Sequence, residues 1–322
     1  MDTIAKIEGV ELEQIIKPTI AAFAPVLEEK RQEIQAVPKK TFKYGKTDRH
    51  QLDIYFPTTP SRTGKLPILF FIYGGGFTSG DRTLGKHADL VYANVGAFFS
   101  ERGFVTVVPD YRLVPYVTYP GPAEDVRDAM QWVVEHTAKL ASLSVEAPDA
   151  GSIFVMAQSV GPVHVSAALW HPGLMSEELK ACVKGVIFIG GAYHLHPEGA
   201  QTGYEELVDI YWGSDEQAER TAPLTLFNNI PEYELRNVPR ILMVESENEP
   251  KWAEITGNDF YDAAKARRGV DVSRVWAKGH NHLSVTWCLS SGQAEEWAEE
   301  AVIWMRMARI TREKVEGNAK GL

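Results

Sequence analysis

A series of short, almost wholly apolar segments is the feature that most constrains the fold of this chain. Residues 66–73 read LPILFFIY and run directly into three glycines. A strand that is apolar on both sides belongs in a sheet with both faces covered, which is the usual environment of parallel strands. Comparable segments follow at residues 104–111, 152–159, 183–191, 240–246 and 272–279. Helical stretches separate most of them, so the pattern predicts an α/β fold with a mostly parallel central sheet and helices on both faces.

The segments between and around these strands carry turn and helix signals. Residues 41–56 indicate two strands joined by a polar turn. The N-terminal residues 3–36 are predicted to be helical, with Pro18 as an interruption and an apolar face formed by Ile16, Ile20, Phe23 and Leu27. Two further helices are predicted from apolar stripes: residues 124–137, with Val126, Ala129, Met130 and Val133, and residues 293–310, with Trp297, Ala301, Trp304, Met305 and Ala308.

Residues 192–237 break the alternation of strands and helices. The segment has no clear buried strand but contains Tyr193, Tyr204, Tyr211, Trp212 and Phe227. We expect it to be an insertion over one end of the sheet. A chain of 322 residues could hold two domains of about 150 residues each, but single α/β domains often reach this length. We therefore expect one domain over residues 1–322, with residues 1–37 and 192–237 forming a helical cap.

Composition and charge narrow the class of protein. The chain is 44% hydrophobic and 24% charged, which is typical of soluble globular proteins and excludes a disordered chain. Its formal net charge of -10 disfavours nucleic acid as a partner. No apolar run reaches the roughly 20 residues that span a bilayer, and the first residues lack the apolar core of a secretory signal. Two cysteines, Cys182 and Cys288, cannot form a disulfide framework, so we expect reduced thiols and a cytoplasmic location.

A candidate nucleophile lies where the strand at residues 152–158 meets the following helix. The sequence there is Ala157-Gln158-Ser159-Val160-Gly161. A sharp strand-to-helix turn lifts a serine hydroxyl clear of the sheet, and small residues on either side let strand and helix pack closely. The helix N-terminus then offers the N–H of Val160 to a developing oxyanion. The competing interpretation is an ordinary N-cap serine.

The three glycines after the first apolar strand are a second candidate. Gly74, Gly75 and Gly76 stand between Tyr73 and Phe77. Consecutive glycines are costly unless the backbone must bend sharply or approach another group closely. An oxyanion hole needs such bare N–H groups. A phosphate-binding loop fits poorly, because neither GxxxxGK[ST] nor GxGxxG is present, and a plain turn is the remaining alternative.

Together these motifs resemble a known family. The segments YGGGF, VPDYRLVPYVTYPGPAEDVRDAMQWV and AQSVG are similar to those of α/β-hydrolase-fold proteins, and most of all to hormone-sensitive-lipase-like esterases and kynurenine formamidases. The resemblance covers about residues 40–310. It implies a serine hydrolase that needs no cofactor and acts on a small-molecule ester. Two positions depart from the family pattern: Tyr73 replaces the usual histidine before the glycines, and Ala157 replaces the first glycine around the serine.

The resemblance also implies an acid. In this fold the order along the chain is nucleophile, acid, histidine. The family's acid lies in a G-x-x-D-P-like turn after a strand, and residues 246–250 (SENEP) fit that frame with Glu249 at the acid position. Glu247 and Glu245 are rivals, and a solvated acidic loop is the alternative interpretation.

The base follows from the same resemblance. The last strand ends in His280-Asn281-His282-Leu283. The family tends to show a catalytic histidine followed by a large apolar residue, which fits His282 and not His280. We expect His282 to act as general base and then acid, with His280 buttressing the loop.

These expectations define a site and its alternatives. The predicted site consists of a triad (Ser159, Glu249 and His282), an oxyanion hole (the N–H groups of Gly74, Gly75 and Val160) and substrate-binding side chains (Tyr73, Phe77, Tyr193 and Trp212). The expected substrate is a carboxylic ester of a small to medium, fairly apolar molecule. An amidase such as a formamidase, a lyase or cyclase on the same scaffold, and a non-catalytic ligand receptor are the alternatives.

Other polar residues are expected to be structural. The pairs His280/His282 and His194/His196 have no third ligand at a convincing spacing, so no metal is expected. His164 is interpreted as a packed, hydrogen-bonded histidine, and Asp110, Arg112 and Asp125 as structural polar contacts behind the site. Related esterases often dimerise through their last strand and helix, and nothing in residues 272–310 requires a homodimer.

Overall fold

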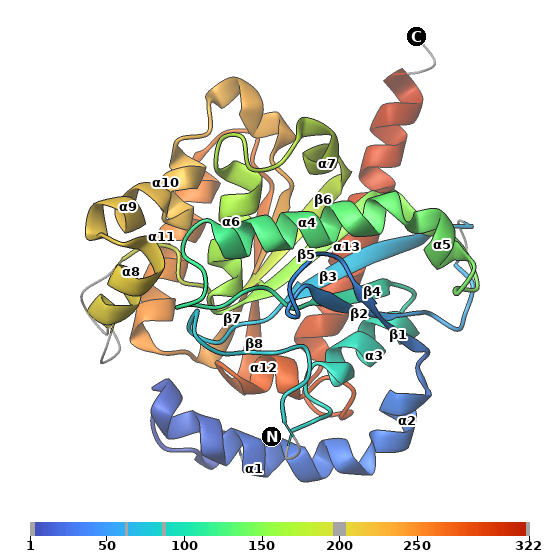
Figure 1. Cartoon of the computed structure of the whole chain (residues 1–322), viewed down its shortest axis with the longest axis horizontal. Coiled ribbons are helices and arrows are strands. Elements are labelled where there is room, and N and C mark those ends of the chain that lie inside the picture. Colours follow the sequence, from blue (N-terminus) through green and yellow to red (C-terminus); the bar gives the residue numbers. More distant parts are fainter. Residues whose placement is uncertain (1–3, 62–63, 86–87, 196–203, 320–322) are drawn as a thin grey trace.

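The computed structural model describes residues 4–61, 64–85, 88–195 and 204–319, and an eight-stranded sheet forms its centre (Figure 1). The strands are β1 (Lys39–Lys43), β2 (Gln51–Tyr55), β3 (Leu66–Ile72), β4 (Val105–Pro109), β5 (Pro148–Gln158), β6 (Val183–Ile189), β7 (Arg240–Asn248) and β8 (Val272–Asn281). Across the sheet they follow the order β1-β2-β4-β3-β5-β6-β7-β8. β2 pairs antiparallel with β1 and with β4, and the other neighbours are parallel. The predicted α/β fold and each predicted strand are confirmed.

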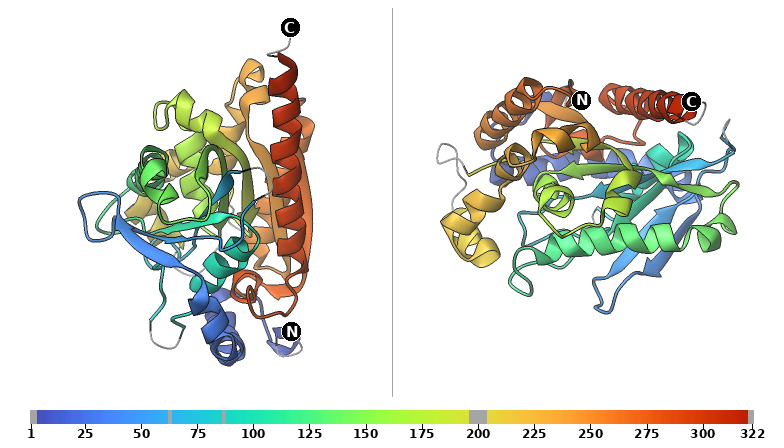
Figure 2. Two further views of the ribbon diagram at one scale, coloured as in Figure 1. Left: turned by 90° about the vertical axis from the view of Figure 1, so that its right-hand side faces the viewer. Right: turned by 90° about the horizontal axis from the view of Figure 1, so that it is seen from above.

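Helices cover both faces of the sheet, as predicted. Figure 2 shows α13 (Glu296–Ala319) on one face and α4 (Gly121–Glu135) and α6 (Gly161–Trp170) on the opposite face. Strand β6 contacts a helix on each side. On one side, a Cβ at Gly185 would lie 2.6 Å from the ring of Trp304 on α13. On the other side, the centroid of the Phe188 ring lies 6.1 Å from that of Trp170 on α6. Five short or flanking helices complete these layers: α3 (Ala93–Glu101), α5 (Thr137–Ala141), α7 (Glu177–Cys182), α11 (Lys251–Ala266) and α12 (Ser284–Trp287).

The N-terminal segment is helical, but its buried face differs from the predicted one. It forms η1 (Ile4–Lys6), α1 (Leu12–Glu29) and α2 (Arg31–Ala36), and α1 continues through Pro18. Its buried residues are Ile15, Thr19, Phe23 and Leu27. Ile16 is 40% exposed, so its assignment to the buried face was wrong. The i, i+4 stripe runs through Thr19 because the threonine hydroxyl accepts a hydrogen bond from the buried Asn281 side chain (3.0 Å).

The described part of residues 192–237 contains helices and no strand, and residues 192–195 are irregular. They contain α8 (Tyr204–Trp212), α9 (Asp215–Thr221), α10 (Pro223–Asn228) and η2 (Glu232–Asn237). Figure 1 shows α8 and α9 beside the sheet and α1 passing beneath α12. The role of these two segments as a cap stays a prediction.

One edge of the sheet collects the loops that matter for function. β3, β5, β6, β7 and β8 are parallel neighbours, so their carboxyl ends lie at the same edge. The segments that follow these strands contain the predicted glycine loop, nucleophile, acid and base.

Candidate active site

The turn around Ser159 has the strained geometry that the sequence predicts for a nucleophile. Ser159 lies between β5 and α6 with a φ of 60°, a left-handed conformation that costs a non-glycine residue about 1–3 kcal/mol and is concentrated at functional sites. The turn requires a glycine at position 161, because a Cβ there would lie 2.5 Å from the Ile72 carbonyl oxygen and clash with it. The Ser159 N–H donates to the Ile189 carbonyl oxygen (2.9 Å). The serine is thus held between β3 and β6 rather than at a plain helix cap.

The predicted acid and base form a buried pair. His282 Nδ1 lies 2.6 Å from Glu249 Oε2, and the two side chains are 1% and 4% exposed. A carboxylate on Nδ1 favours the tautomer that leaves Nε2 as the acceptor. Nε2 is buried and has no hydrogen-bond partner in the described part of the chain. The imidazole therefore has one nitrogen fixed by an acid and the other available to accept a proton.

Gly190 makes room for this pair. It follows β6 with a φ of 49°, and a Cβ there would lie 2.7 Å from Glu249 Oε1 and 2.9 Å from His282 Nδ1. Any side chain would push the acid and the base apart. The sequence contains a signal for this residue, a glycine pair directly after a buried strand (VKGVIFIGG), but glycine pairs have many uses and this one was not predicted.

The histidine turn is tied to the nucleophile turn and to distant helices. Gln158 Nε2 donates to the His282 carbonyl oxygen (2.7 Å). Asn281 accepts from the N–H groups of Leu283 and Ser284 at the start of α12. Asn94 donates from its side chain to carbonyl oxygens at the other end of α12, including those of Thr286 and Leu289. The contacts of Gln158, Asn281 and Asn94 were not predicted, because no pattern in the sequence distinguishes these residues from other polar side chains.

The glycine loop passes directly against Ser159. A Cβ at Gly74 would lie 2.6 Å from Ser159 Cβ and 3.2 Å from Ser159 Oγ. Gly75 has a φ of 136°, and a Cβ there would collide with the Ser79 carbonyl oxygen. Within the described residues, the N–H groups of Gly74, Gly75 and Val160 make no intramolecular hydrogen bond. Three unpaired backbone donors therefore border the nucleophile.

Tyr73 does not lie where a substrate could reach it. Its side chain is buried, and its hydroxyl donates to Asp110 Oδ1 (2.7 Å) and accepts from Arg49 Nη2 (2.9 Å). Its ring stacks between those of Tyr92 and Tyr111. The expectation of a substrate contact was wrong, because polar groups from distant segments already satisfy the hydroxyl beneath the glycine loop.

The other predicted pocket residues divide into two groups. Phe77 stacks on Tyr211 (ring centroids 4.3 Å apart) and meets Trp212 edge-on (5.2 Å). This small apolar cluster also includes Val160, next to the nucleophile. Tyr193 instead is fully buried in the main core and stacks on Phe260 of α11 (4.6 Å). Phe77 and Trp212 remain candidates for substrate contact, whereas the assignment of Tyr193 was wrong.

The rival acids occupy different environments. Glu247 is exposed and accepts the N–H of Gly279 (2.7 Å). Glu245 is buried, and neither of its carboxyl oxygens has a partner in the described residues. Burial first, and then the charge of Glu249, raise the pKa of Glu245 to about 8. Neither rival hydrogen-bonds a histidine in the described residues. Of the three glutamates, only Glu249 therefore lies where it can orient the His282 imidazole.

The other histidines considered in the sequence analysis do not join the acid–base pair where the structure describes them. His280 Nδ1 lies 3.1 Å from Ser284 Oγ and Nε2 lies 2.8 Å from the Ala294 carbonyl oxygen, which agrees with the predicted buttress. His164 Nδ1 lies 3.1 Å from the Tyr211 hydroxyl, and burial lowers the pKa of His164 to about 3, so it is neutral. His194 Nε2 pairs with Asp259 (2.8 Å), and His196 lies outside the described residues. The described residues contain no group of three or more metal-ligating side chains.

The predicted structural contacts are present behind the site. The Arg112 guanidinium and N–H both bind the buried Asp125 carboxylate, at distances from 2.7 to 3.0 Å. Asp110 accepts from Tyr73 and from the N–H of Arg82 (2.6 Å).

Both cysteines are free thiols. No helix that the structure describes is long and apolar enough to cross a membrane.

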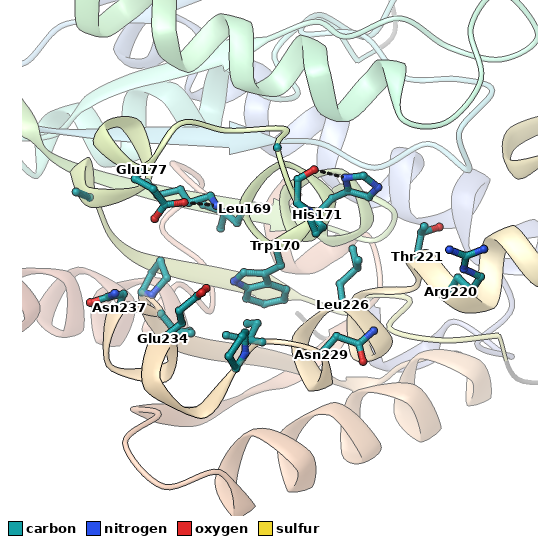
Figure 3. Close-up of a pocket in the computed structure, with 18 of the residues that line it drawn as sticks. Leu169, Trp170, His171, Glu177, Arg220, Thr221, Leu226, Asn229, Glu234 and Asn237 are labelled. Carbon is teal, nitrogen blue, oxygen red and sulfur yellow. Dashed lines mark hydrogen bonds and ion pairs between the residues drawn. The ribbon is translucent and has the colours of Figure 1, made fainter.

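A cavity of about 950 Å³ lies away from the carboxyl edge of the sheet. Figure 3 shows it between the end of α6, where Trp170 and His171 lie, and the segment that carries Leu226, Asn229 and Glu234. None of the predicted site residues lines it. A smaller cavity, of about 250 Å³, lies between α1, residues 88–91 and Trp287. Trp287 is the last residue of α12, the short helix that begins two residues after His282.

Comparison with known proteins gives partial matches to a family model, to an esterase and to a synthase. Residues 52–168 match the BD-FAE family model. Esterase LipI of Mycobacterium tuberculosis is 33% identical over 140 residues, which cover 39% of this chain and 40% of that protein. Methylphloroacetophenone synthase of Cladonia uncialis is 32% identical over 150 residues, which cover 45% of this chain and 5% of that protein. The matched stretch thus spans less than half of the length of these curated relatives.

Solved structures match over nearly the whole chain. Esterase B from Lactobacillus rhamnosis superposes with a TM-score of 0.70 at 15% identity, covering 95% of this chain and 98% of that one. Carboxyl esterase 2 from Tuber melanosporum has a TM-score of 0.66 at 18% identity, with coverages of 90% and 98%. At these identities the matches establish the fold.

Proposed function

We propose, from the α/β-hydrolase fold of this chain, that it is a carboxylic-ester hydrolase acting through an acyl-enzyme on Ser159. The observation that carries the proposal is the convergence at one sheet edge of a strained serine, unpaired backbone donors and a buried histidine–glutamate pair. The curated relative named as an esterase, matched over 140 residues, supports the same reaction class.

The proposed reaction uses these groups in turn. His282 Nε2 takes the proton of Ser159 Oγ as the oxygen attacks the ester carbonyl carbon, and the imidazolium then protonates the departing alcohol. Glu249 keeps Nδ1 protonated and stabilises the imidazolium. Water, deprotonated by the same histidine, attacks the acyl-enzyme and returns the serine and a free carboxylic acid. No step needs a metal ion or a cofactor.

The oxyanion is stabilised by the glycine loop and the start of α6. In the part of the chain that the structure describes, the N–H groups of Gly74, Gly75 and Val160 have no competing partner, so they are free to donate to the tetrahedral oxygen. Removing one such donor in a comparable enzyme costs about 100- to 1,000-fold in kcat. Preorganised donors are effective because they need not reorient as the charge develops.

The substrate is proposed to be a small to medium ester with an apolar or aromatic group. Phe77, Tyr211 and Trp212 form an aromatic cluster beside Val160, and ligand sites are mostly apolar with few polar groups. The helices of residues 204–237 and α1 would then act as the cap that shapes the pocket. The net charge of -10 disfavours polyanionic substrates.

The test is hydrolysis of p-nitrophenyl acetate, butyrate and octanoate by wild type and Ser159→Ala, with fluorophosphonate labelling of both proteins. We expect activity and labelling in the wild type and neither in the variant, with Ser142→Ala, an exposed serine, as the unaffected control. Full activity in Ser159→Ala would refute the mechanism. Labelling without ester hydrolysis would instead favour an amidase, and N-formyl amides would then be assayed.

A further inference from the structure

The glycine loop closes on itself beneath the candidate active site. Gly80, at the far end of the loop, has a φ of 109°, and a Cβ there would lie 2.6 Å from the Gly74 carbonyl oxygen and 2.7 Å from the Tyr73 ring. The two ends of residues 73–80 therefore lie against each other. The N–H groups of Gly74 and Gly75 are held by this closed loop, so whatever fixes its two ends also fixes the donors.

Arg49 contacts both ends at once. Its Nη2 donates to the Tyr73 hydroxyl (2.9 Å) and to the Gly80 carbonyl oxygen (2.8 Å), and its Nε donates to the Tyr111 carbonyl oxygen (2.8 Å). Within the described residues it is the one side chain that hydrogen-bonds both Tyr73 and Gly80. It comes from the turn between β1 and β2, at the opposite edge of the sheet from the histidine.

A second set of contacts anchors the same loop but does not replace Arg49. Asp110 accepts from the Tyr73 hydroxyl and from the N–H of Arg82, and the Arg82 guanidinium pairs with Asp110 and with Asp53. This set holds Tyr73 and the chain beyond the loop. Within the described residues it makes no hydrogen bond to Gly80. Inside the loop, the N–H and hydroxyl of Ser79 donate to the Gly75 carbonyl oxygen (3.0 and 2.8 Å). Among side chains from outside the loop that the structure describes, Arg49 is the one that hydrogen-bonds Gly80 and ties it to Tyr73.

We propose that Arg49 is a positioning residue that sets the geometry of the oxyanion donors. Its planar guanidinium presents several donors in a fixed fork, which a lysine ammonium cannot reproduce. Arg49 therefore affects the transition state, through Gly74 and Gly75, more than it affects substrate binding. The inference rests on the proposed ester hydrolysis.

The experiment compares Arg49→Lys and Arg49→Ala with wild type on p-nitrophenyl butyrate, and measures inhibition by butaneboronic acid, whose serine adduct is tetrahedral. We expect kcat to fall about 10- to 100-fold in both variants, in the range of a weakened oxyanion donor, with KM changed less than about twofold. Inhibition by the boronic acid should weaken by a similar factor. Added guanidinium chloride at low millimolar concentration should restore part of the kcat of Arg49→Ala and none of that of Arg49→Lys.

Arg267→Lys is the matched control. Its guanidinium also bridges two backbone carbonyl oxygens, those of Phe227 and Ile230, but far along the chain from the glycine loop. A general loss of stability would lower the melting temperature in Arg267→Lys and Arg49→Lys alike and leave kcat per labelled Ser159 unchanged.

The outcomes separate the two proposals. If the wild type hydrolyses the ester while Arg49→Lys keeps its kcat and boronic acid affinity, the positioning role is refuted and the proposed function stands. If the wild type neither hydrolyses esters nor reacts with the fluorophosphonate, the proposed function fails, and this inference fails with it.

Discussion

The two halves of the candidate catalytic machinery are fixed by different physical means. The ends of the glycine loop are held by hydrogen bonds to charged side chains: Arg49 donates to Tyr73 and Gly80, and Asp110 accepts from the Tyr73 hydroxyl. The acid and base are buried, and uncharged groups make their further contacts: Gly190 lies against both of them, the Ser246 N–H donates to Glu249 Oε1 (3.3 Å) and Gln158 donates to the His282 carbonyl oxygen (2.7 Å). The neighbouring Glu245 carboxyl has no hydrogen-bond partner in the described residues.

The difference follows from what each half must do. Backbone donors must be aimed at one point in space, and directional charge-assisted hydrogen bonds provide that aim. The histidine must instead change its charge during each turnover, and a low-dielectric surrounding strengthens its interaction with Glu249. The comparison predicts that substitutions on the acid–base side act through charge and volume, whereas those on the loop side act through hydrogen-bond geometry.

Among substitutions around the acid–base pair, the largest effect is expected from Glu249→Gln. An amide of nearly equal volume lacks the carboxylate charge and can donate to Nδ1, which favours the wrong imidazole tautomer. In the serine-protease triad the equivalent change lowers kcat about 10,000-fold, and we expect at least a 100-fold loss here, measured with p-nitrophenyl butyrate. Glu247→Gln, an exposed glutamate two residues away, is the control and should retain activity. A reversed result would assign the acid to Glu247.

A smaller but still large loss is expected from Gly190→Ala. A Cβ at 2.7 Å from Glu249 Oε1 and 2.9 Å from His282 Nδ1 must displace the pair, and a displacement of about 1 Å can cost roughly 100-fold in rate. Gly173→Ala is the control for the strain of placing alanine in a left-handed backbone conformation. At Gly173 φ is 79° and no atom lies within 4 Å of the added Cβ. Equal kcat losses in the two variants would show that strain, not contact with the pair, is responsible.

The smallest effect, and the most specific to the acid–base side, is expected in stability against pH. Burial raises the pKa of Glu245 from 4.5 to about 8, so between these values the folded state holds a proton that the unfolded state has lost. The free energy of unfolding therefore falls as pH rises through this window. Glu245→Gln removes this dependence, and its melting temperature should exceed that of wild type by several degrees at pH 8 and by less at pH 5.

The control for that measurement is Glu232→Gln, an exposed glutamate on η2, which should shift the melting temperature equally at both pH values. Parallel melting curves for wild type and Glu245→Gln across pH 5–8 would contradict a neutral buried carboxyl at this position.

Much of this fold could be predicted because strands β3 to β7 are largely apolar on both sides, so each of them is visible in the sequence without its neighbours. Ser159, Glu249 and His282 could be located because they follow such strands and fit family motifs, and the structure brings their turns to one edge of the sheet. Their catalytic roles stay predictions that the experiments above test.

The errors arose where a side chain's environment depends on distant segments. Tyr73 was assigned to the substrate because the sequence does not reveal Arg49 and Asp110 beneath it. Tyr193 was assigned to the pocket because its stacking partner, Phe260, lies on a helix far along the chain. Ile16 was assigned to the buried face because the spacing of apolar residues does not reveal that Asn281 donates a hydrogen bond to Thr19.

The bond between Thr19 and Asn281 also has a consequence for the order of folding. It joins residues 262 positions apart, and the bond from Asn94 to Thr286 on α12 joins residues 192 positions apart. The turn that carries His282 therefore reaches its final position only after the first helix, the middle of the chain and the last strand have met. Recovery of enzymatic activity during refolding should accordingly trail the recovery of helical signal, because activity reports the last long-range contact and not the formation of any single segment.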